Sequence, residues 1–203
     1  MSIFKKRTRF PHAAEVLAAE GFTDNYIDVL KEELKTAEHP QDIARGKSFL
    51  ANALLIRGRL TEAFEAFQEI NLKKLERHLQ GNLVSNMIFC KFVQNKFKEA
   101  EELYQTYNAM VLGERTEAMK RSLAIHEHIQ GRYEVAVEII AKMGDSSCRF
   151  IDICMVKSLL RLDMFSQAED YSLKFGEYKN CNELSVEVGK LKKKIQAKIN
   201  SEL

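Results

Sequence analysis

The stretch Gly58-Arg59-Leu60-Thr61-Glu62-Ala63 returns three times in altered form, as N-K-F-K-E-A from residue 95, G-R-Y-E-V-A from residue 131 and D-M-F-S-Q-A from residue 163. Its first position always holds Gly, Asn or Asp, which best tolerate the left-handed conformation that ends a helix. Its last position is always alanine, and a small side chain there lets two helices approach closely. The stretch therefore predicts a tight turn between two packed helices.

Large side chains recur in the same register around the four alanines, Ala63, Ala100, Ala136 and Ala168. Residues four apart on a helix share a face, so such a register predicts which faces are buried. Three residues before the alanines stand Leu60, Phe97, Tyr133 and Phe165. Four residues after them stand Phe67, Tyr104, Ile140 and Ser172, of which only the serine is small. Thirteen residues before them stand Leu50, Met87, Leu123 and Met155.

The turns at residues 58–63 and 131–136 resemble those of tetratricopeptide repeats (TPR), where a tight turn is followed by a large apolar residue and an alanine. The resemblance covers residues 44 to 177. It implies a right-handed superhelix, or α-solenoid, in which antiparallel helix hairpins stack side by side.

Sparse turn-forming residues also favour an all-α fold, because two prolines and nine glycines are too few for a turn-rich β protein. Pro11 suits a first helical position and Thr23 an N-cap, which predicts one more hairpin ahead of the repeats. A final apolar stripe predicts a capping helix, with a coiled-coil seam as the alternative: Leu184, Val188, Leu191, Ile195 and Ile199. We therefore expect a basic tail at 1–10, about five hairpins near 11–38, 40–71, 80–111, 114–143 and 148–177, and a cap at 179–203.

The formal net charge of +2 gives no global field that would attract nucleic acid or an acidic membrane, so neither is expected as a partner. Four scattered cysteines, Cys90, Cys148, Cys154 and Cys181, form no C-x-x-C pair and favour reduced, mostly buried thiols. No apolar signal segment opens the sequence, and no run of 18 apolar residues occurs in it. A cytoplasmic protein is expected.

The sequence does not favour catalysis, a metal or a cofactor. His126 and His128 are two residues apart, so on a helix they point to different faces and cannot chelate one ion. Ser122 and His126 are four apart, but no exposed nucleophile elbow accompanies them. Glycine-rich phosphate-binding motifs are absent as well. We therefore expect no enzyme.

The predicted function is that of a scaffold or chaperone-like adaptor for protein–protein interaction, because the first helices of stacked hairpins line a concave groove that can hold a peptide or helix. The register places these candidates there: Ser48, Asn52, Ser85, Asn86, Phe89, Arg121, Ile125, His128 and Lys157. For Phe89 and Ile125 a place in the core is an equal alternative. A homodimer is left open, and a ligand- or peptide-sensing regulatory module is the alternative function.

Some TPR proteins clamp the C-terminal carboxylates of chaperone tails with two asparagines and three basic residues. The resemblance puts Asn52 and Asn86 on the asparagine positions, but Ser48, Ala118 and Ser122 stand where the cations would be. A carboxylate bound there would lack its charge-assisted partners, so we do not expect this clamp.

Overall fold

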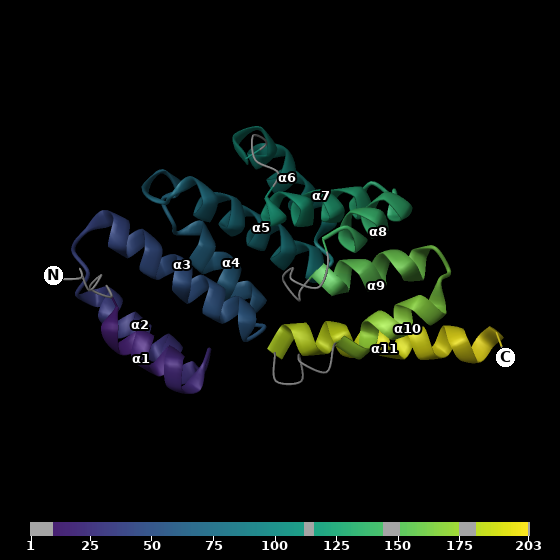
Figure 1. The fold of residues 1–203 in the computed structure, drawn as a ribbon, viewed down its shortest axis with the longest axis horizontal. Coiled ribbons are helices and arrows are strands. Elements are labelled where there is room, and N and C mark those ends of the chain that lie inside the picture. The colour runs from purple at the N-terminus through teal and green to yellow at the C-terminus, as the bar shows by residue number, and fades with distance from the viewer. Residues whose placement is uncertain (1–9, 112–115, 144–150, 175–181, 203) are drawn as a thin grey trace, which may run out of the picture. The chain divides into compact units, whose positions relative to one another are not determined.

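The computed structural model describes residues 10–111, 116–143, 151–174 and 182–202. Over these residues the chain is helical and contains no β-strand (Figure 1). The chain divides into two compact units, Met1–Glu76 and Arg77–Leu203. The all-α class predicted from the sequence is thereby confirmed.

Each unit is a chain of helices that pack on their sequence neighbours. In the first unit α1 packs on α2, α2 on α3 and α3 on α4. In the second unit α5 packs on α6 and α7, α7 on α6, α8 and α9, and α10 on α9 and α11. The first unit consists of α1 (Pro11–Glu20), α2 (Asp24–Lys35), α3 (Pro40–Ile56), α4 (Leu60–Gln68) and a short 3-10 helix, η1 (Leu72–Lys74). The second consists of α5 (Arg77–Val93), α6 (Phe97–Val111), α7 (Glu117–Ile129), α8 (Tyr133–Ala141), α9 (Ile151–Arg161), α10 (Phe165–Leu173) and α11 (Asn182–Glu202).

Several helices begin at residues that favour a helix start. Pro11 and Pro40 open α1 and α3, where proline's missing N–H has no helical partner to lose. Thr23 caps α2 as predicted, because its Oγ1 accepts a hydrogen bond from the backbone N–H of Tyr26 at 3.2 Å. Thr116 caps α7 in the same way. These signals depend only on residues next to each helix start, so they act independently of tertiary contacts.

The four predicted turns all contain a left-handed residue at the expected position. Gly58, Asn95, Gly131 and Asp163 have φ angles of 70°, 60°, 79° and 57°. At Gly58 the backbone closes a Schellman motif: Gly58 N–H donates to Leu55 O at 2.9 Å, and Arg59 N–H to Leu54 O at 3.0 Å. The corresponding two backbone hydrogen bonds are formed at the turns that contain Asn95 and Gly131. The turn prediction is confirmed in its conformation as well as its position.

The four alanines that define the register, Ala63, Ala100, Ala136 and Ala168, are all completely buried, with an exposed fraction of 0%. The residues four positions later, Phe67, Tyr104, Ile140 and Ser172, are buried on the same helix faces. Because a methyl group leaves room for a neighbouring backbone, the second helix of each pair lies close to the first.

Gly46 in the middle of α3 permits a similarly close approach in the first unit. A Cβ at this position would lie 2.5 Å from Leu34 Cδ2 and 2.5 Å from Phe10 Cζ, well inside van der Waals contact. The buried ring of Phe10 and the end of α2 therefore pack directly on the α3 backbone.

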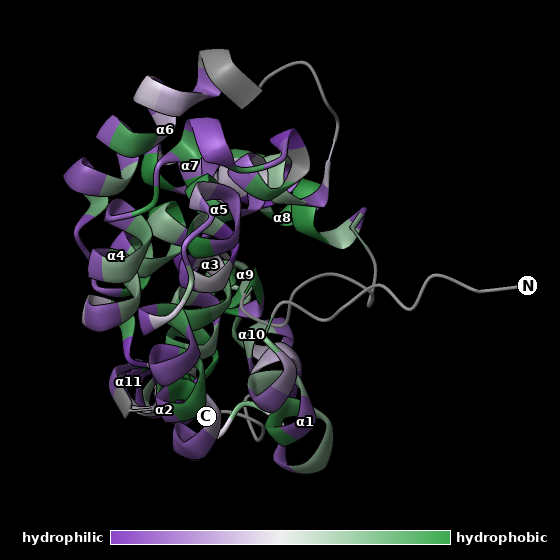
Figure 2. Ribbon diagram, turned by 90° about the vertical axis from the view of Figure 1, so that its left-hand side faces the viewer, coloured by the Kyte–Doolittle hydropathy of each residue, from purple (hydrophilic) through white to green (hydrophobic). Residues whose placement is uncertain are grey.

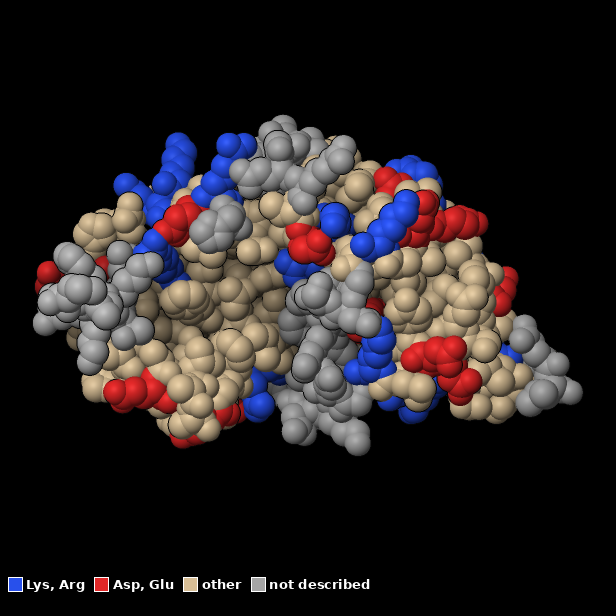
Figure 3. Space-filling model, in the orientation of Figure 1, with Lys and Arg blue, Asp and Glu red and all other residues tan. Residues whose placement is uncertain are grey.

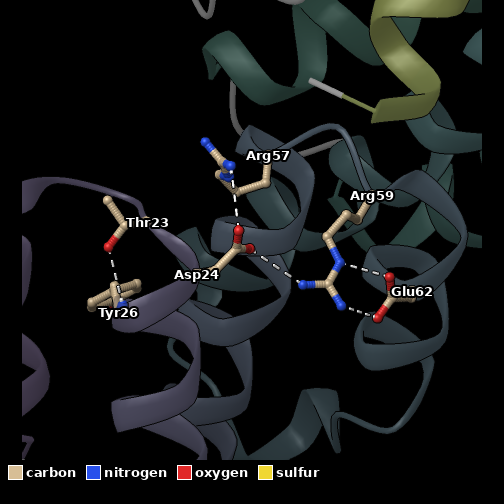
Figure 4. A network of polar contacts seen from close by, with 6 residues as sticks. All are labelled: Thr23, Asp24, Tyr26, Arg57, Arg59 and Glu62. Carbon is tan, nitrogen blue, oxygen red and sulfur yellow. Dashed lines mark hydrogen bonds and ion pairs between the residues drawn. The ribbon is translucent and has the colours of Figure 1, made fainter. Parts of the chain in front are cut away.

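An ionic network joins the start of α2 to the turn between α3 and α4 (Figure 4). Asp24 pairs with Arg57 at 3.4 Å and with Arg59 at 3.5 Å. Arg59 also makes a two-pronged contact with Glu62, with Nε–Oε1 and Nη2–Oε2 distances of 2.6 and 2.5 Å. The Asp24 side chain is 62% exposed, so each of its pairs contributes at most about 1 kcal/mol.

The last helix, α11, packs on α9 and α10 through its apolar stripe. Leu184, Val188, Leu191 and Ile195 of the predicted stripe are buried, and Ile199 is half-buried. Helices in both units combine hydrophobic and hydrophilic segments (Figure 2), and acidic and basic side chains are interspersed on the face drawn in Figure 3. Within the described ranges, none of the helices is both long enough and apolar enough to cross a bilayer.

Candidate functional site

The nine candidate groove residues divide between the two units and differ in exposure. Ser48 and Asn52 lie on α3 of the first unit, and the other seven lie on α5, α7 and α9 of the second. Only three of the nine are partly exposed, Asn52, Asn86 and Arg121. The other six are buried: Ser48, Ser85, Phe89, Ile125, His128 and Lys157.

Two groove assignments are corrected by this burial. Phe89 and Ile125 have exposed fractions of 5% and 1%, so they belong to the core and present no surface to a partner. The small residues Ser48 and Ser85 are likewise enclosed. Arg121 remains partly exposed on α7, and its Nη2 donates to Asn82 Oδ1 on α5 at 3.5 Å. Most of the residues predicted to line a groove are therefore enclosed by the protein.

His128 and Lys157 are the two candidates that the structure brings together at an opening. They line a pocket of about 320 Å³ in the second unit, which we call the basic pocket. It lies between the α5–α6 turn, the end of α7, the second half of α9 and the middle of α11. Its lining consists of Asn95, Phe97, His128, Lys157, Leu160, Arg161, Glu187, Lys190, Leu191 and Lys194.

Lys157 forms the inner end of the basic pocket and is held by two polar partners. Its Nζ lies 2.8 Å from Glu187 Oε1 and donates to Asn95 Oδ1 at 2.9 Å. The ammonium also lies over the ring of Phe92, 5.0 Å from its centroid. Burial lowers the pKa of Lys157, and the bond to Glu187 opposes that shift because it favours the charged form. The ion pair fixes α11 against α9 at this point.

His128 lies beside Lys157 and is neutral at pH 7. Burial, with the nearby charges of Lys157 and Arg161, lowers the pKa of His128 to about 4. Its Nδ1 is 2.8 Å from Ser158 Oγ, which itself donates to the carbonyl of Cys154 at 2.9 Å. Since the serine has one proton and gives it to that carbonyl, His128 Nδ1 is the donor toward Ser158.

The outer part of the basic pocket carries three cations, Arg161, Lys190 and Lys194. Lys190 is 3.9 Å from Glu187, but its side chain is 68% exposed, which makes this a weak pair. Arg161 lies over the ring of Tyr133 at 5.9 Å. Neither Arg161 nor Lys194 forms an ion pair with a carboxylate of the described residues. Among the lining residues that the structure describes, four cations thus face one carboxylate, an excess of three positive charges in a chain whose net charge is only +2.

Sequence reasoning missed Asn95, Arg161, Glu187, Lys190 and Lys194 as site residues. A signal was present, because Lys157 and Arg161 are four apart on α9, and Lys190 and Lys194 are four apart on α11. Each pair therefore projects from one face of its helix. The last helix was predicted from its apolar stripe, and no local pattern in the sequence places its lysines next to α9.

The other side chains that were considered for catalysis or metal binding are buried or have hydrogen-bond partners. Ser122 Oγ donates to the carbonyl of Ala118 at 2.9 Å, and His126 Nδ1 lies 2.7 Å from Glu101 Oε2. Cys90 and Cys154 are free and buried, as predicted, and burial raises the pKa of both thiols to about 12. Cys148 and Cys181 lie outside the described residues. In the described part of the chain, no three residues of the types His, Cys, Asp and Glu gather closely enough to hold a metal ion.

Comparison with known proteins does not assign the chain to a family. No protein-family model matches the sequence, and no curated protein matches it significantly. The functional argument therefore depends on the basic pocket and the helices around it.

Proposed function

We propose that this protein is a non-catalytic scaffold for protein–protein interaction, built as a TPR-like α-solenoid, and that it binds a peptide or helix of a partner at the basic pocket. The observation that carries the proposal is that α11, an amphipathic helix, already lies against this side of the second unit. Its Glu187 pairs with Lys157 on α9, and its Glu183 accepts from Gln94 Nε2 at the end of α5 at 3.1 Å. A surface that holds one amphipathic helix through carboxylates and apolar contacts is suited to hold a second segment beside it.

The solenoid part of the proposal is supported by the repeated register. Left-handed residues end α3, α5, α7 and α9, and a fully buried alanine follows each of them by five residues. Helices joined by such turns pack on their neighbours in sequence, as units of a solenoid do. We propose about five hairpins, in which the first helices face inward.

The non-catalytic part is supported by the hydrogen bonds of the one serine–histidine pair at the basic pocket. Ser158 is completely buried and gives its proton to the carbonyl of Cys154. His128 acts as a donor toward that serine and cannot serve as its base. We therefore assign this pair a structural role, beside a pocket whose cations bind charge.

Site-directed photocrosslinking in the native host tests this function. A photoreactive amino acid replaces Lys190, which lines the basic pocket, and in a control it replaces Lys193 on the same helix outside the lining. We expect position 190 to crosslink to a defined segment of one partner, identified by mass spectrometry, and position 193 to give none of it. Equal crosslinking from both positions, or no crosslinking from position 190, contradicts the proposal.

The pocket volume also supports the alternative of a ligand-sensing module, since about 320 Å³ lies at the lower end of the range for small-molecule sites. Native mass spectrometry of protein purified from its host separates the two functions. A stoichiometric small molecule that is lost on substitution of Arg161 favours sensing, and its absence together with the crosslink favours the scaffold.

A further inference from the structure

Among the described residues, the carboxylates that line the basic pocket are too few to balance its outer cations. Lys157 is already neutralised by Glu187. Arg161, Lys190 and Lys194 are all exposed and line the opening, where their charges act on a group that enters the pocket. A concave wall that carries charges of one sign raises the local concentration of oppositely charged groups. The site is therefore built for an anion.

The chain itself shows which kind of anion the inner position accepts. Glu187 is a carboxylate on an amphipathic helix, and it binds Lys157 and Asn95 while its neighbours Val188 and Leu191 are buried. One segment, α11, thus supplies both the carboxylate and the apolar contacts. An incoming segment of the same type would place its carboxylates on the three outer cations.

The lining also distinguishes such a segment from a bare inorganic anion. Phe97, Leu160 and Leu191 contribute apolar surface to the basic pocket. A small phosphate would leave this surface in contact with water, whereas a peptide side chain next to a carboxylate would cover it.

From this charge excess, the internal example and the apolar lining, we infer that the basic pocket binds an acidic, amphipathic segment of a partner protein. The carboxylates of the segment pair with Arg161, Lys190 and Lys194, and an apolar side chain covers Phe97 and Leu160. This inference rests on the proposed scaffold function and specifies the chemistry of the partner. The contact is an electrostatic one at a rim, so it weakens steeply with added salt.

Fluorescence anisotropy with the full chain tests the inference. The probe is a labelled synthetic amphipathic peptide with glutamates at every third or fourth position, and its counterpart has glutamine in their place. We expect the glutamate peptide to bind at least about tenfold more tightly than the glutamine peptide at low salt. Lys190→Gln with Lys194→Gln is expected to remove most of this difference.

The matched control is Lys192→Gln with Lys193→Gln, which removes the same charge from exposed positions of the same helix outside the pocket lining. We expect binding within about twofold of the unmodified chain for this control, because the removed charges are solvent-screened. Arg161→Gln provides a second test from α9, in case the α11 variant alters its helix. Circular dichroism confirms that each variant keeps its helicity.

Three results would overturn the inference: equal binding of both peptides, equal weakening by the control, or competition by inorganic pyrophosphate as strong as that of the unlabelled peptide. The last result would assign the site to small anions. If the acidic peptide fails but the crosslink from position 190 persists, only the partner chemistry is wrong and the scaffold function stands. If the crosslink also fails, the scaffold function fails with it.

Discussion

Asn95 shows how one residue serves both the fold and the candidate site. Its backbone adopts the left-handed conformation, with φ 60°, that ends α5. Its side chain accepts from Lys157 through Oδ1 and donates to Glu187 through Nδ2 at 3.3 Å. Glycine, which occupies the same position after α3 and α7, would satisfy the backbone but not these side chains. The choice of asparagine at this turn is thus explained by the basic pocket.

Gly131→Ala isolates the conformational role of the turn residue. Gly131 has φ 79°, and a Cβ there would meet no atom within 4 Å, so the substitution introduces backbone strain without a clash. We expect the free energy of unfolding to fall by about 1 kcal/mol. Urea denaturation measures this loss. Gly189→Ala, also free of contacts but in the middle of α11, is the control and should not destabilise the chain.

His128 makes stability depend on pH in a defined window. Its pKa is about 4 in the folded chain and about 6.5 when unfolded, so below pH 6.5 the unfolded chain takes up a proton that the folded chain does not. Stability from this group is complete above pH 6.5 and is lost as pH falls toward 4. We expect a loss of about 2 kcal/mol by pH 5. His128→Gln should flatten the difference between urea midpoints at pH 7 and pH 5; an unchanged difference would show that His128 is not its source.

At the scale of the elements, the four helix pairs from α3/α4 to α9/α10 follow from a local pattern. A left-handed residue, a large apolar residue and an alanine occur within six positions, so the sequence contains the turn and the close packing in one short stretch. The starts at Pro11, Thr23 and Pro40 were also predictable because caps act locally. The start of α5 at Arg77, three residues ahead of the expected range, has no such signal.

Ala136→Leu tests the packing of α7 on α8. Ala136 is fully buried, and a larger side chain must push the two helices apart. We expect a loss of roughly 1–3 kcal/mol in the free energy of unfolding. Ala141→Leu, at an exposed position of the same helix, provides the comparison and should leave the melting temperature almost unchanged. Equal effects of the two variants would contradict the alignment of the repeats.

Glu187→Gln tests the attachment of α11. Lys157 and Glu187 have side-chain exposures of only 7% and 11%, so removal of the carboxylate leaves a buried ammonium without its counter-charge. We expect a loss of about 3 kcal/mol, measured by urea denaturation. Lys157→Met added to Glu187→Gln should restore most of this stability, because the unpaired charge is then absent. If the double variant is no more stable than the single one, the ion pair is not the origin of the effect.

At the scale of the whole molecule, the sequence predicted the helices well and the candidate site only in part. Helix faces and turns depend on residues close in the chain, which a repeat pattern reveals. The basic pocket depends on α11 meeting α9, where Glu187 lies thirty residues beyond Lys157, and no local pattern encodes that contact. For this reason Arg161, Lys190 and Lys194 were not predicted to lie beside His128 and Lys157. Phe89 and Ile125, for which the groove and the core were equal alternatives, lie in the core.

Amide hydrogen exchange of the full chain, with and without a saturating acidic amphipathic peptide, tests the claim that partners bind at the basic pocket. The account predicts slower exchange in the second half of α9, the middle of α11 and the turn that contains Asn95. Exchange in α1 to α4 should not change. Slower exchange confined to α3 around Ser48 and Asn52, or no change in α9 and α11 at saturation, would contradict it.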